Sequence, residues 1–253
     1  MSHARTPLLR LGAIALASGT TLGAMAGTAG AATAASSGNS GASAVPATLA
    51  GIKAKAASDI TERVDDLNAA IAKVNAAKGL GASQPTLVSY LGADIAPLQQ
   101  LNQTIQGDST LQQAAHDFGT IFSVYRVYRL VLPAAHIAAA ADHATTSAVP
   151  NLTTDAAKAQ ARVNPANQAT LEPLIDDLDS QISSAANATN GLAATVLAFT
   201  PAQWNADNAL LNAPRSSDQS ATDALKKGRA DIAQIEQDLK ADHAAASSTT
   251  TTS

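Results

Sequence analysis

The residues best suited to chemistry in this chain of 253 residues lie in one stretch, Leu111–His143, which holds four of the seven aromatic side chains. Phe122, Arg129 and His136 follow one another at intervals of seven residues, so an α-helix would place them on one face, with Tyr125 in the adjacent row. The bulky residues around them predict that this face is buried. A guanidinium on a buried face needs a polar partner, because an unpaired buried charge is costly.

Arg129 has two possible structural partners and one functional one. The structural ones are a carboxylate from another helix, such as Asp94 or Asp176, and the carbonyl groups that a helix kink at Pro133 would leave free. The functional partner is an anionic ligand in a cavity beside Tyr125. The sequence favours a structural partner. The candidate ligand or structural site predicted from these patterns consists of Phe122, Tyr125, Arg129 and His136.

Other patterns in the same stretch favour packing over chemistry. Tyr125 and Tyr128 with Arg126 alternate aromatic and basic character, as surfaces that bind nucleic acids or sugars do, but their helical spacing favours core packing. His136 and His143 are two helical turns apart, about 10 Å, whereas metal-ligand pairs on one helix are three or four residues apart. We therefore predict no metal site here.

The sequence gives little support to catalysis. It contains no G-x-S-x-G, no H-E-x-x-H and no glycine-rich phosphate loop, and it has no cysteine. The adjacent acids Asp65–Asp66 and Asp176–Asp177 point in different directions on a helix. We predict that the protein is not an enzyme, with no catalytic residues and no cofactor.

The first 31 residues read as an export signal. Arg5 and Arg10 form a positive segment, residues 11–29 are uncharged and largely apolar, and residues 29–31 resemble a cleavage site. An uncleaved anchor is the alternative. After cleavage we expect no stable membrane span and a secreted or cell-wall-associated protein. Residues 32–46 predict a flexible low-complexity leader.

The charge balance bears on the partner. The formal net charge is −4, and cleavage after residue 31 would remove two arginines and no acid. The sequence shows no basic patch, so nucleic acid is not expected as a partner. The expected partner is an unknown protein or a cell-wall component, and the amphipathic helices also permit self-association.

Helical periodicity extends from residue 47 to residue 243, with no sustained strand pattern. We predict an all-α fold, an elongated up-and-down bundle of four to five long helices with coiled-coil-like seams. Residues 110–145 form its expected central helix, kinked near Pro133. Residues 244–253 are predicted to form a disordered tail. The other expected helices span 47–78, 85–106 with a kink near 92–94, 153–163, 166–199, 201–211 and the segment from about 212 onwards.

Two segments carry a family resemblance. Residues 122–142, FSVYRVYRLVLPAAHIAAAAD, and residues 196–211, VLAFTPAQWNADNALL, resemble patterns in exported, alanine-rich helical proteins of actinobacteria, a family of unknown function. The second segment contains Thr200-Pro201-Ala202-Gln203, a capping box with proline at the first helical position. The resemblance implies an exported helical protein and supplies no binding residues.

Two functional hypotheses follow. The leading one is an exported, non-enzymatic helical bundle that acts as a structural or interaction module of the extracellular space or cell wall. The alternative is a carrier of an apolar or amphipathic small ligand, held between helices near Phe118–Leu132. The carrier would need a continuous apolar cavity of about 300 Å³ or more beside Tyr125 and Arg129.

Overall fold

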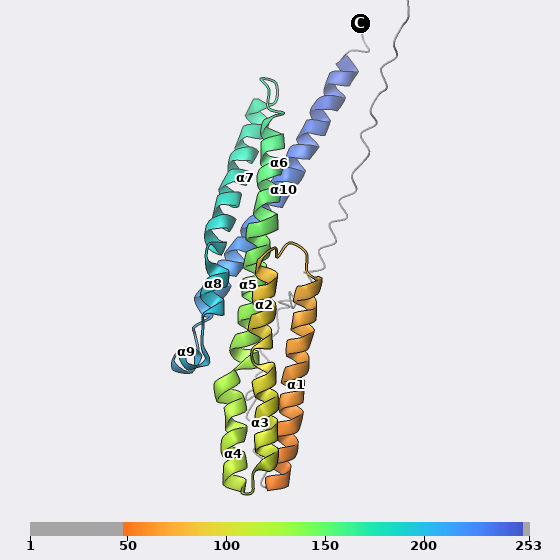
Figure 1. Ribbon diagram of the computed structural model, residues 1–253. Coiled ribbons are helices and arrows are strands. Elements are labelled where there is room, and N and C mark those ends of the chain that lie inside the picture. The colour runs from red at the N-terminus through yellow and green to blue at the C-terminus, as the bar shows by residue number, and fades with distance from the viewer. Residues whose placement is uncertain (1–47, 250–253) are drawn as a thin grey trace, which may run out of the picture. The chain divides into compact units, whose positions relative to one another are not determined.

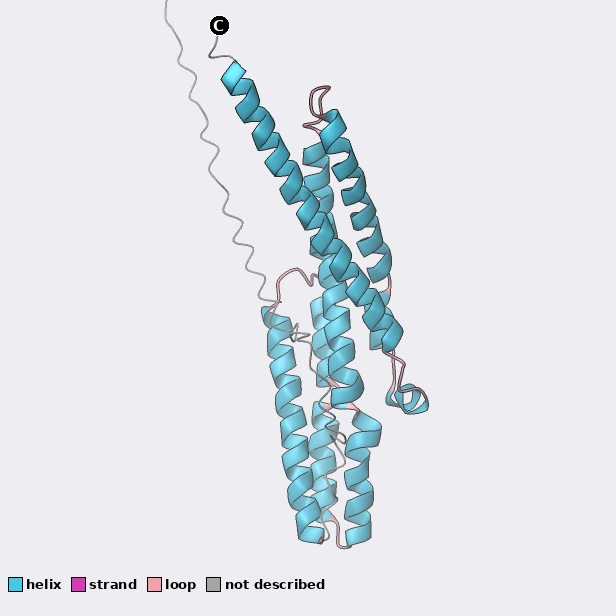
Figure 2. Cartoon of the chain, turned by 180° about the vertical axis from the view of Figure 1, so that it is seen from behind, coloured by secondary structure: helices cyan, strands magenta, loops and turns pink. Residues whose placement is uncertain are grey.

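The computed structural model describes residues 48–249, and this part of the chain is a helical bundle without strands (Figures 1 and 2). The predicted all-α bundle is confirmed. The predicted signal (1–31) and leader (32–46) lie outside the described residues. None of the described helices is long and apolar enough to cross a membrane. The α-helices are α1 Leu49–Ala76, α2 Ser83–Gly92, α3 Ile95–Gly107, α4 Leu111–Thr120, α5 Leu132–His143, α6 Val149–Gln160, α7 Gln168–Thr189, α8 Leu192–Leu197, α9 Pro201–Ala206 and α10 Asn212–Thr249; the π turns are η2 Ile121–Tyr125, η3 Val127–Val131 and η4 Ala144–Ala148.

The bundle has two hydrophobic clusters. The first joins α1–α5 with α8 and α9, and the second joins α6, α7 and α10. The segment from α4 to α6 passes through both clusters, and α5 contacts α1, α2, α8 and α10 (Figure 1). The prediction that the aromatic-rich segment lies at the centre of the bundle is thus right for α5.

Threonine side chains start several helices. Thr48 accepts a hydrogen bond from the Gly51 amide, 3.1 Å away, and Thr110 accepts one from the Gln113 amide, 3.2 Å away. At α9, Thr200 and Gln203 form the reciprocal capping box that the sequence predicts. Each cap satisfies an amide that has no partner within its helix. These local signals therefore fix where α1, α4 and α9 begin.

The aromatic-rich segment is broken at Arg126, seven residues before the predicted kink at Pro133. Arg126 has φ 48° and ψ 32° and is the one non-glycine residue with positive φ among the described residues. Its carbonyl accepts the amides of residues 129, 130 and 131 at 2.8–3.3 Å. The π turns η2 and η3 flank the break. Pro133 then sits near the start of α5, where it needs no amide hydrogen.

Pro150 is placed in the same way. The prediction ended the central helix near residue 145 and began a separate helix at 153, which was wrong. The chain instead continues through η4 into α6, with Pro150 near the start of α6. A wider π turn precedes each proline, so the missing amide is accommodated without a loop.

Several other predicted boundaries are corrected. The expected helix 166–199 is divided by Gly191, whose φ of 67° ends α7 and begins α8, because glycine adopts the left-handed region without strain. The expected helix 201–211 ends at Ala206. In contrast, α10 continues to Thr249, past the predicted end of the bundle at 243. Alanines 244–246 favour helix, which explains the extension. Residues 250–253 lie outside the described range.

Gly79, in the loop after α1, is the tightest glycine site described. Its φ is 82°, and a Cβ there would lie 2.9 Å from Nδ1 of His143 and 3.1 Å from Cβ of Ser147. Both the backbone conformation and the space therefore require glycine. The carbonyl of Gly79 also accepts a hydrogen bond from the Thr146 hydroxyl, which ties the loop to η4.

Candidate functional site

Arg129 lies on the surface, so the prediction that it is buried was wrong. The prediction assumed one uninterrupted α-helix from Phe122 to His136. The left-handed residue Arg126 and the two π turns change the rotation per residue, so Arg129 leaves the row of Phe122. It lines a pocket of about 500 Å³, here called the arginine pocket. The pocket is lined by Arg126, Tyr128, Arg129, Trp204, Asn208 and Arg215.

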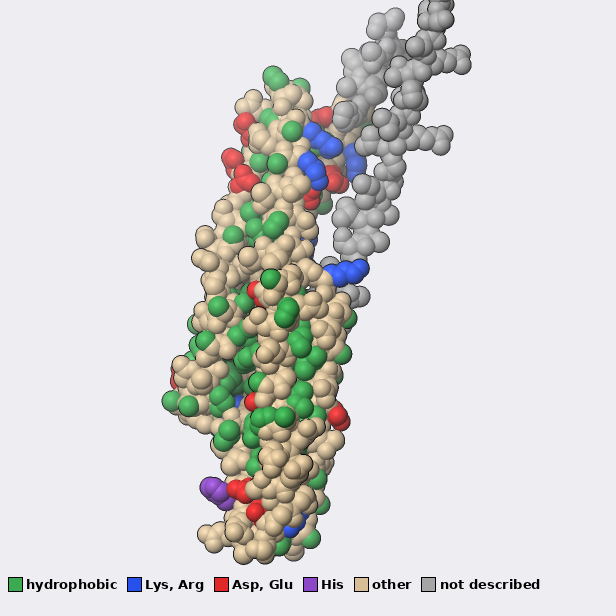
Figure 3. Space-filling model, viewed as in Figure 1, with side chains coloured by type: hydrophobic (Ala, Val, Ile, Leu, Met, Phe, Trp, Pro, Cys, Tyr) green, Lys and Arg blue, Asp and Glu red, His purple; other side chains and the backbone are tan. Residues whose placement is uncertain are grey.

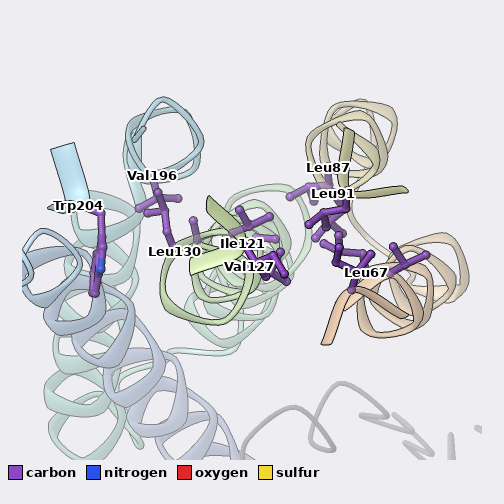
Figure 4. Packing of buried hydrophobic residues seen from close by; sticks show 14 of the residues in the cluster. Leu67, Leu87, Leu91, Ile121, Val127, Leu130, Val196 and Trp204 are labelled. Atoms are coloured by element: carbon purple, nitrogen blue, oxygen red, sulfur yellow. The ribbon is translucent and has the colours of Figure 1, made fainter. Parts of the chain in front are cut away.

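Three separate parts of the chain build the arginine pocket. Arg126 and Arg129 come from the helix break and η3, and Arg215 comes from the first turn of α10. Trp204 is on α9, is 7% exposed and belongs to the first hydrophobic cluster. Figure 4 shows Trp204 and Val196 on one side of the segment that carries Leu130, across from α1 and α2. The wall that Trp204 provides is therefore anchored in the core.

Asn205 holds α9 against the helix break from both sides. Nε of Arg126 donates to Oδ1 of Asn205 at 2.7 Å, and Nδ2 of Asn205 donates to the carbonyl of Ser123 at 2.9 Å. A non-glycine residue in the left-handed region costs about 1–2 kcal/mol. Strain of this kind persists when surrounding contacts fix the backbone. We call the pair of bonds the Asn205 clamp.

The arginine pocket carries positive charge only. None of the described residues that line it is acidic. The ion pairs found within residues 48–249 join Lys55 to Asp59 and Lys158 to Asp155, away from this site. On the face seen in Figure 3, by contrast, acidic and basic side chains are mixed over the α6–α7–α10 part. Three guanidiniums thus share one pocket in a protein whose formal net charge is −4.

The carboxylates nearest in sequence to the pocket are engaged elsewhere. Asp207 accepts a hydrogen bond from the Ala209 amide, 2.8 Å away, within the α9–α10 loop. Asp218, one turn after Arg215, interacts with His136 of α5. Burial raises the pKa of Asp218, and the positive charge of His136 partly offsets this. Neither carboxylate lines the pocket.

Among residues 48–249 the buried arginine is Arg63 on α1, which sequence reasoning missed. It is 7% exposed, and its guanidinium lies 4.9 Å from the ring centres of both Phe122 and Tyr128. Its Nη1 donates to the carbonyl of Asp59 at 2.7 Å. The Tyr128 hydroxyl donates to Asp66 at 2.8 Å. Arg63 therefore braces α1 against the π turns through cation–π contacts, and Phe122 belongs to this brace.

Tyr128 joins the brace to the arginine pocket, because it takes part in both. Partial burial raises its pKa above the usual value, and the hydrogen bond to Asp66 raises it further. Tyr128 therefore stays protonated at neutral pH and keeps its hydroxyl committed to Asp66. Tyr128 therefore contributes its aromatic ring to the lining of the pocket. Asp66 also lines a separate hollow of about 600 Å³, whose lining residues all belong to α1 and are mostly polar or acidic.

The four residues predicted as one site are distributed over separate places. Phe122 packs on Phe118, edge to face at 5.3 Å, and under Arg63. Tyr125 lies near Asp94. Burial raises the pKa of the Tyr125 hydroxyl, and the Asp94 carboxylate raises it further. Arg129 lines the arginine pocket, and His136 faces Asp218. The predicted partner Asp94 therefore lies near tyrosine rather than pairing with Arg129.

Sequence reasoning did not connect half of the residues that line the arginine pocket, namely Trp204, Asn208 and Arg215, with Arg129. Their sequence separation from Arg129 gave no sign of proximity. Arg126 was considered only as part of an aromatic–basic alternation and assigned to core packing. One sequence feature pointed toward this part of the pocket. The capping box at Thr200 predicts a short helix that carries Trp204 and comes shortly before α10.

Within residues 48–249, no three His, Cys, Asp or Glu side chains come together as a metal site would require. Comparison with protein-family models, curated proteins and solved structures gives no significant match. The geometry of the arginine pocket is therefore the basis for the functional argument.

Proposed function

We propose that this protein is an exported, non-enzymatic helical module that binds an anionic partner of the extracellular space or cell wall through the arginine pocket. The observation that carries the proposal is the convergence of Arg126, Arg129 and Arg215 in one pocket of about 500 Å³ without an acidic residue in its lining. Export itself rests on the pattern of residues 1–31.

The arginines of the pocket have no acidic partner among the residues that line it. Like charges that line one pocket repel, and no ion pair within residues 48–249 involves these arginines. A bound anion would remove this repulsion and add charge-assisted hydrogen bonds. Because the rest of the protein is acidic, the attraction is confined to the pocket, so the anionic group must enter the pocket, as a single charged unit of a polymer can.

The carrier hypothesis stays a prediction. The pocket beside Arg129 exceeds the required volume, but its lining is cationic and aromatic rather than aliphatic. Large side chains near the break, including Ile121 and Leu130, are fully buried in the first cluster. These features support an anionic partner more than an apolar ligand.

The test is binding of the purified protein to soluble anionic polymers, with poly-glutamate and polyphosphate as two chemistries and neutral dextran as reference. The proposal expects binding to at least one anionic polymer and none to dextran. The double variant R129Q/R215Q should lose it. The matched variant R162Q/R229Q makes the same charge change at two exposed arginines outside the pocket and should keep it. Equal loss in both variants, or no binding by the native protein, would refute the proposal.

A further inference from the structure

We infer that the anionic group recognised by the arginine pocket is a phosphate, and that a carboxylate is bound more weakly. This inference rests on the proposed function and specifies its ligand. The donors that line the pocket, the separate segments that supply them and the charge that they present support it. The same phosphate chemistry can come from a small free phosphate compound or from a phosphate ester on a larger partner.

The donors of the pocket are largely uncommitted. Arg129 and Arg215 make no hydrogen bond or ion pair with the described part of the chain, while Arg126 uses only its Nε, for Asn205. A guanidinium has five N–H donors in a planar fork that matches the oxygen spacing of phosphate. The side-chain amide of Asn208 adds a neutral donor in the lining.

The origin of the arginines in separate segments favours a tetrahedral group. Arg126 and Arg129 come from the helix break and η3, whereas Arg215 comes from α10. A carboxylate is planar and offers two oxygens, which one guanidinium fork satisfies. A phosphate offers three or four oxygens in different directions, so arginines from separate segments can each bind one edge.

The charge points to the same group. Three guanidiniums line the pocket, and Tyr128 adds no proton to donate because its hydroxyl is bonded to Asp66. A phosphate monoester carries about −1.5 to −2 at pH 7, more than a single carboxylate. It therefore neutralises more of the repulsion between the arginines. The ring of Tyr128 and the indole of Trp204 are left for the apolar part of the molecule that carries the phosphate.

Trp204 makes the inference directly measurable, because it is the only tryptophan of the chain and lines the pocket. The experiment titrates the protein with pyrophosphate and, separately, with citrate, an oxyanion of similar charge built from carboxylates. Ionic strength is kept constant with sodium chloride. Tryptophan fluorescence is the first readout, and titration calorimetry is the second, so that a spectroscopically silent complex is still detected.

We expect saturable binding of pyrophosphate about tenfold tighter than that of citrate, and loss of about tenfold or more in affinity in R129Q and in R215Q. R162Q should bind as the native protein does. Arg129 and Arg215 are both exposed, and circular dichroism will confirm that the variants stay folded. Citrate binding as tight as pyrophosphate, or no pyrophosphate binding by either readout, would overturn the inference.

Binding to polyphosphate and poly-glutamate distinguishes a free phosphate compound from a phosphate on a larger partner. It also distinguishes failure of the phosphate inference from failure of the proposed function. Displacement of polyphosphate from the protein by pyrophosphate, with a tighter affinity for the polymer, indicates a phosphate carried on a larger partner. Preference for free pyrophosphate indicates a small ligand. Arginine-dependent binding to poly-glutamate without binding to pyrophosphate would leave the proposed function standing and overturn the phosphate inference. Absence of binding to both polymers and to pyrophosphate would overturn both.

Discussion

The Asn205 clamp is predicted to hold the strained helix break in place, and Asn205→Ala removes it. The variant loses the bond from Nε of Arg126 and the bond to the Ser123 carbonyl, 2.7 and 2.9 Å long. Both are solvent-exposed, so each contributes about 0.5–1.5 kcal/mol. We expect Asn205→Ala to lower the free energy of unfolding by about 1–3 kcal/mol.

Arg126→Gly distinguishes the clamp from the backbone strain. Glycine removes the cost of the left-handed conformation, about 1–2 kcal/mol, and makes the unfolded chain more flexible, which costs about 0.4–1 kcal/mol. It also loses the bond to Asn205. In the native background these changes nearly cancel. In the Asn205→Ala background the bond is already absent, so Arg126→Gly should stabilise the protein by about 0.5–1 kcal/mol.

Urea unfolding of the four proteins of this cycle, followed by circular dichroism, gives the required free energies. Trp204 fluorescence in the same titration reports whether α9 detaches before the bundle unfolds, since Trp204 precedes Asn205. Destabilisation of the protein lacking Asn205 by Arg126→Gly would show that the left-handed residue carries no strain. An unchanged free energy of unfolding in Asn205→Ala would show that the clamp contributes no stability.

Three further predictions concern stability. Gly79→Ala should lower the free energy of unfolding by about 1–3 kcal/mol, since φ is 82° and the new Cβ would lie 2.9 Å from Nδ1 of His143. Gly119→Ala, in α4 with open space around it, should raise the free energy of unfolding by up to about 1 kcal/mol. Melting temperatures will compare the two variants. Arg63→Ala should cost about 2–4 kcal/mol through the lost brace, while Arg129→Met should change stability by less than about 0.5 kcal/mol; equal effects in urea unfolding would contradict this assignment. Burial, and secondarily the Asp94 carboxylate, raise the pKa of Tyr90 to about 12. The stability that the protonated tyrosine contributes is therefore present below pH 10 and is lost as the pH rises toward 12. Tyr90→Phe should reduce this alkaline loss of stability, and an alkaline profile identical to that of the native protein would contradict the prediction.

The helices could be predicted because their signals are local. The seam of α1, the capping box at Thr200 and the glycine-terminated helices each depend on a few neighbouring residues. The pair α2–α3 was also predicted, as one helix with a kink near residues 92–94. Boundaries failed where alanine continued a helix without a stop signal, as at the end of α10.

The site could not be predicted because it depends on the rotation of one segment. A heptad row from Phe122 to His136 requires an uninterrupted α-helix, and the break at Arg126 has no glycine to announce it. As a result Arg129 was expected in the interior, where Arg63 is found. The pattern around Arg63 gave a weak signal, because Asp59 lies one turn earlier beside the apolar seam, and both residues are buried.

The π turn η4 has a consequence for how one continuous segment serves two hydrophobic clusters. Ala141 belongs to the first cluster, and Ala144 and Ala148 belong to the second. A π turn contains an extra residue relative to an α-helix, and each α-helical residue turns the chain by about 100°. The extra residue therefore acts as a phase shift that redirects the apolar stripe. Deleting a single residue within η4 would keep the segment helical and turn the apolar face of α6 away from α7 and α10. The packing of α6 therefore depends on the number of residues in this turn.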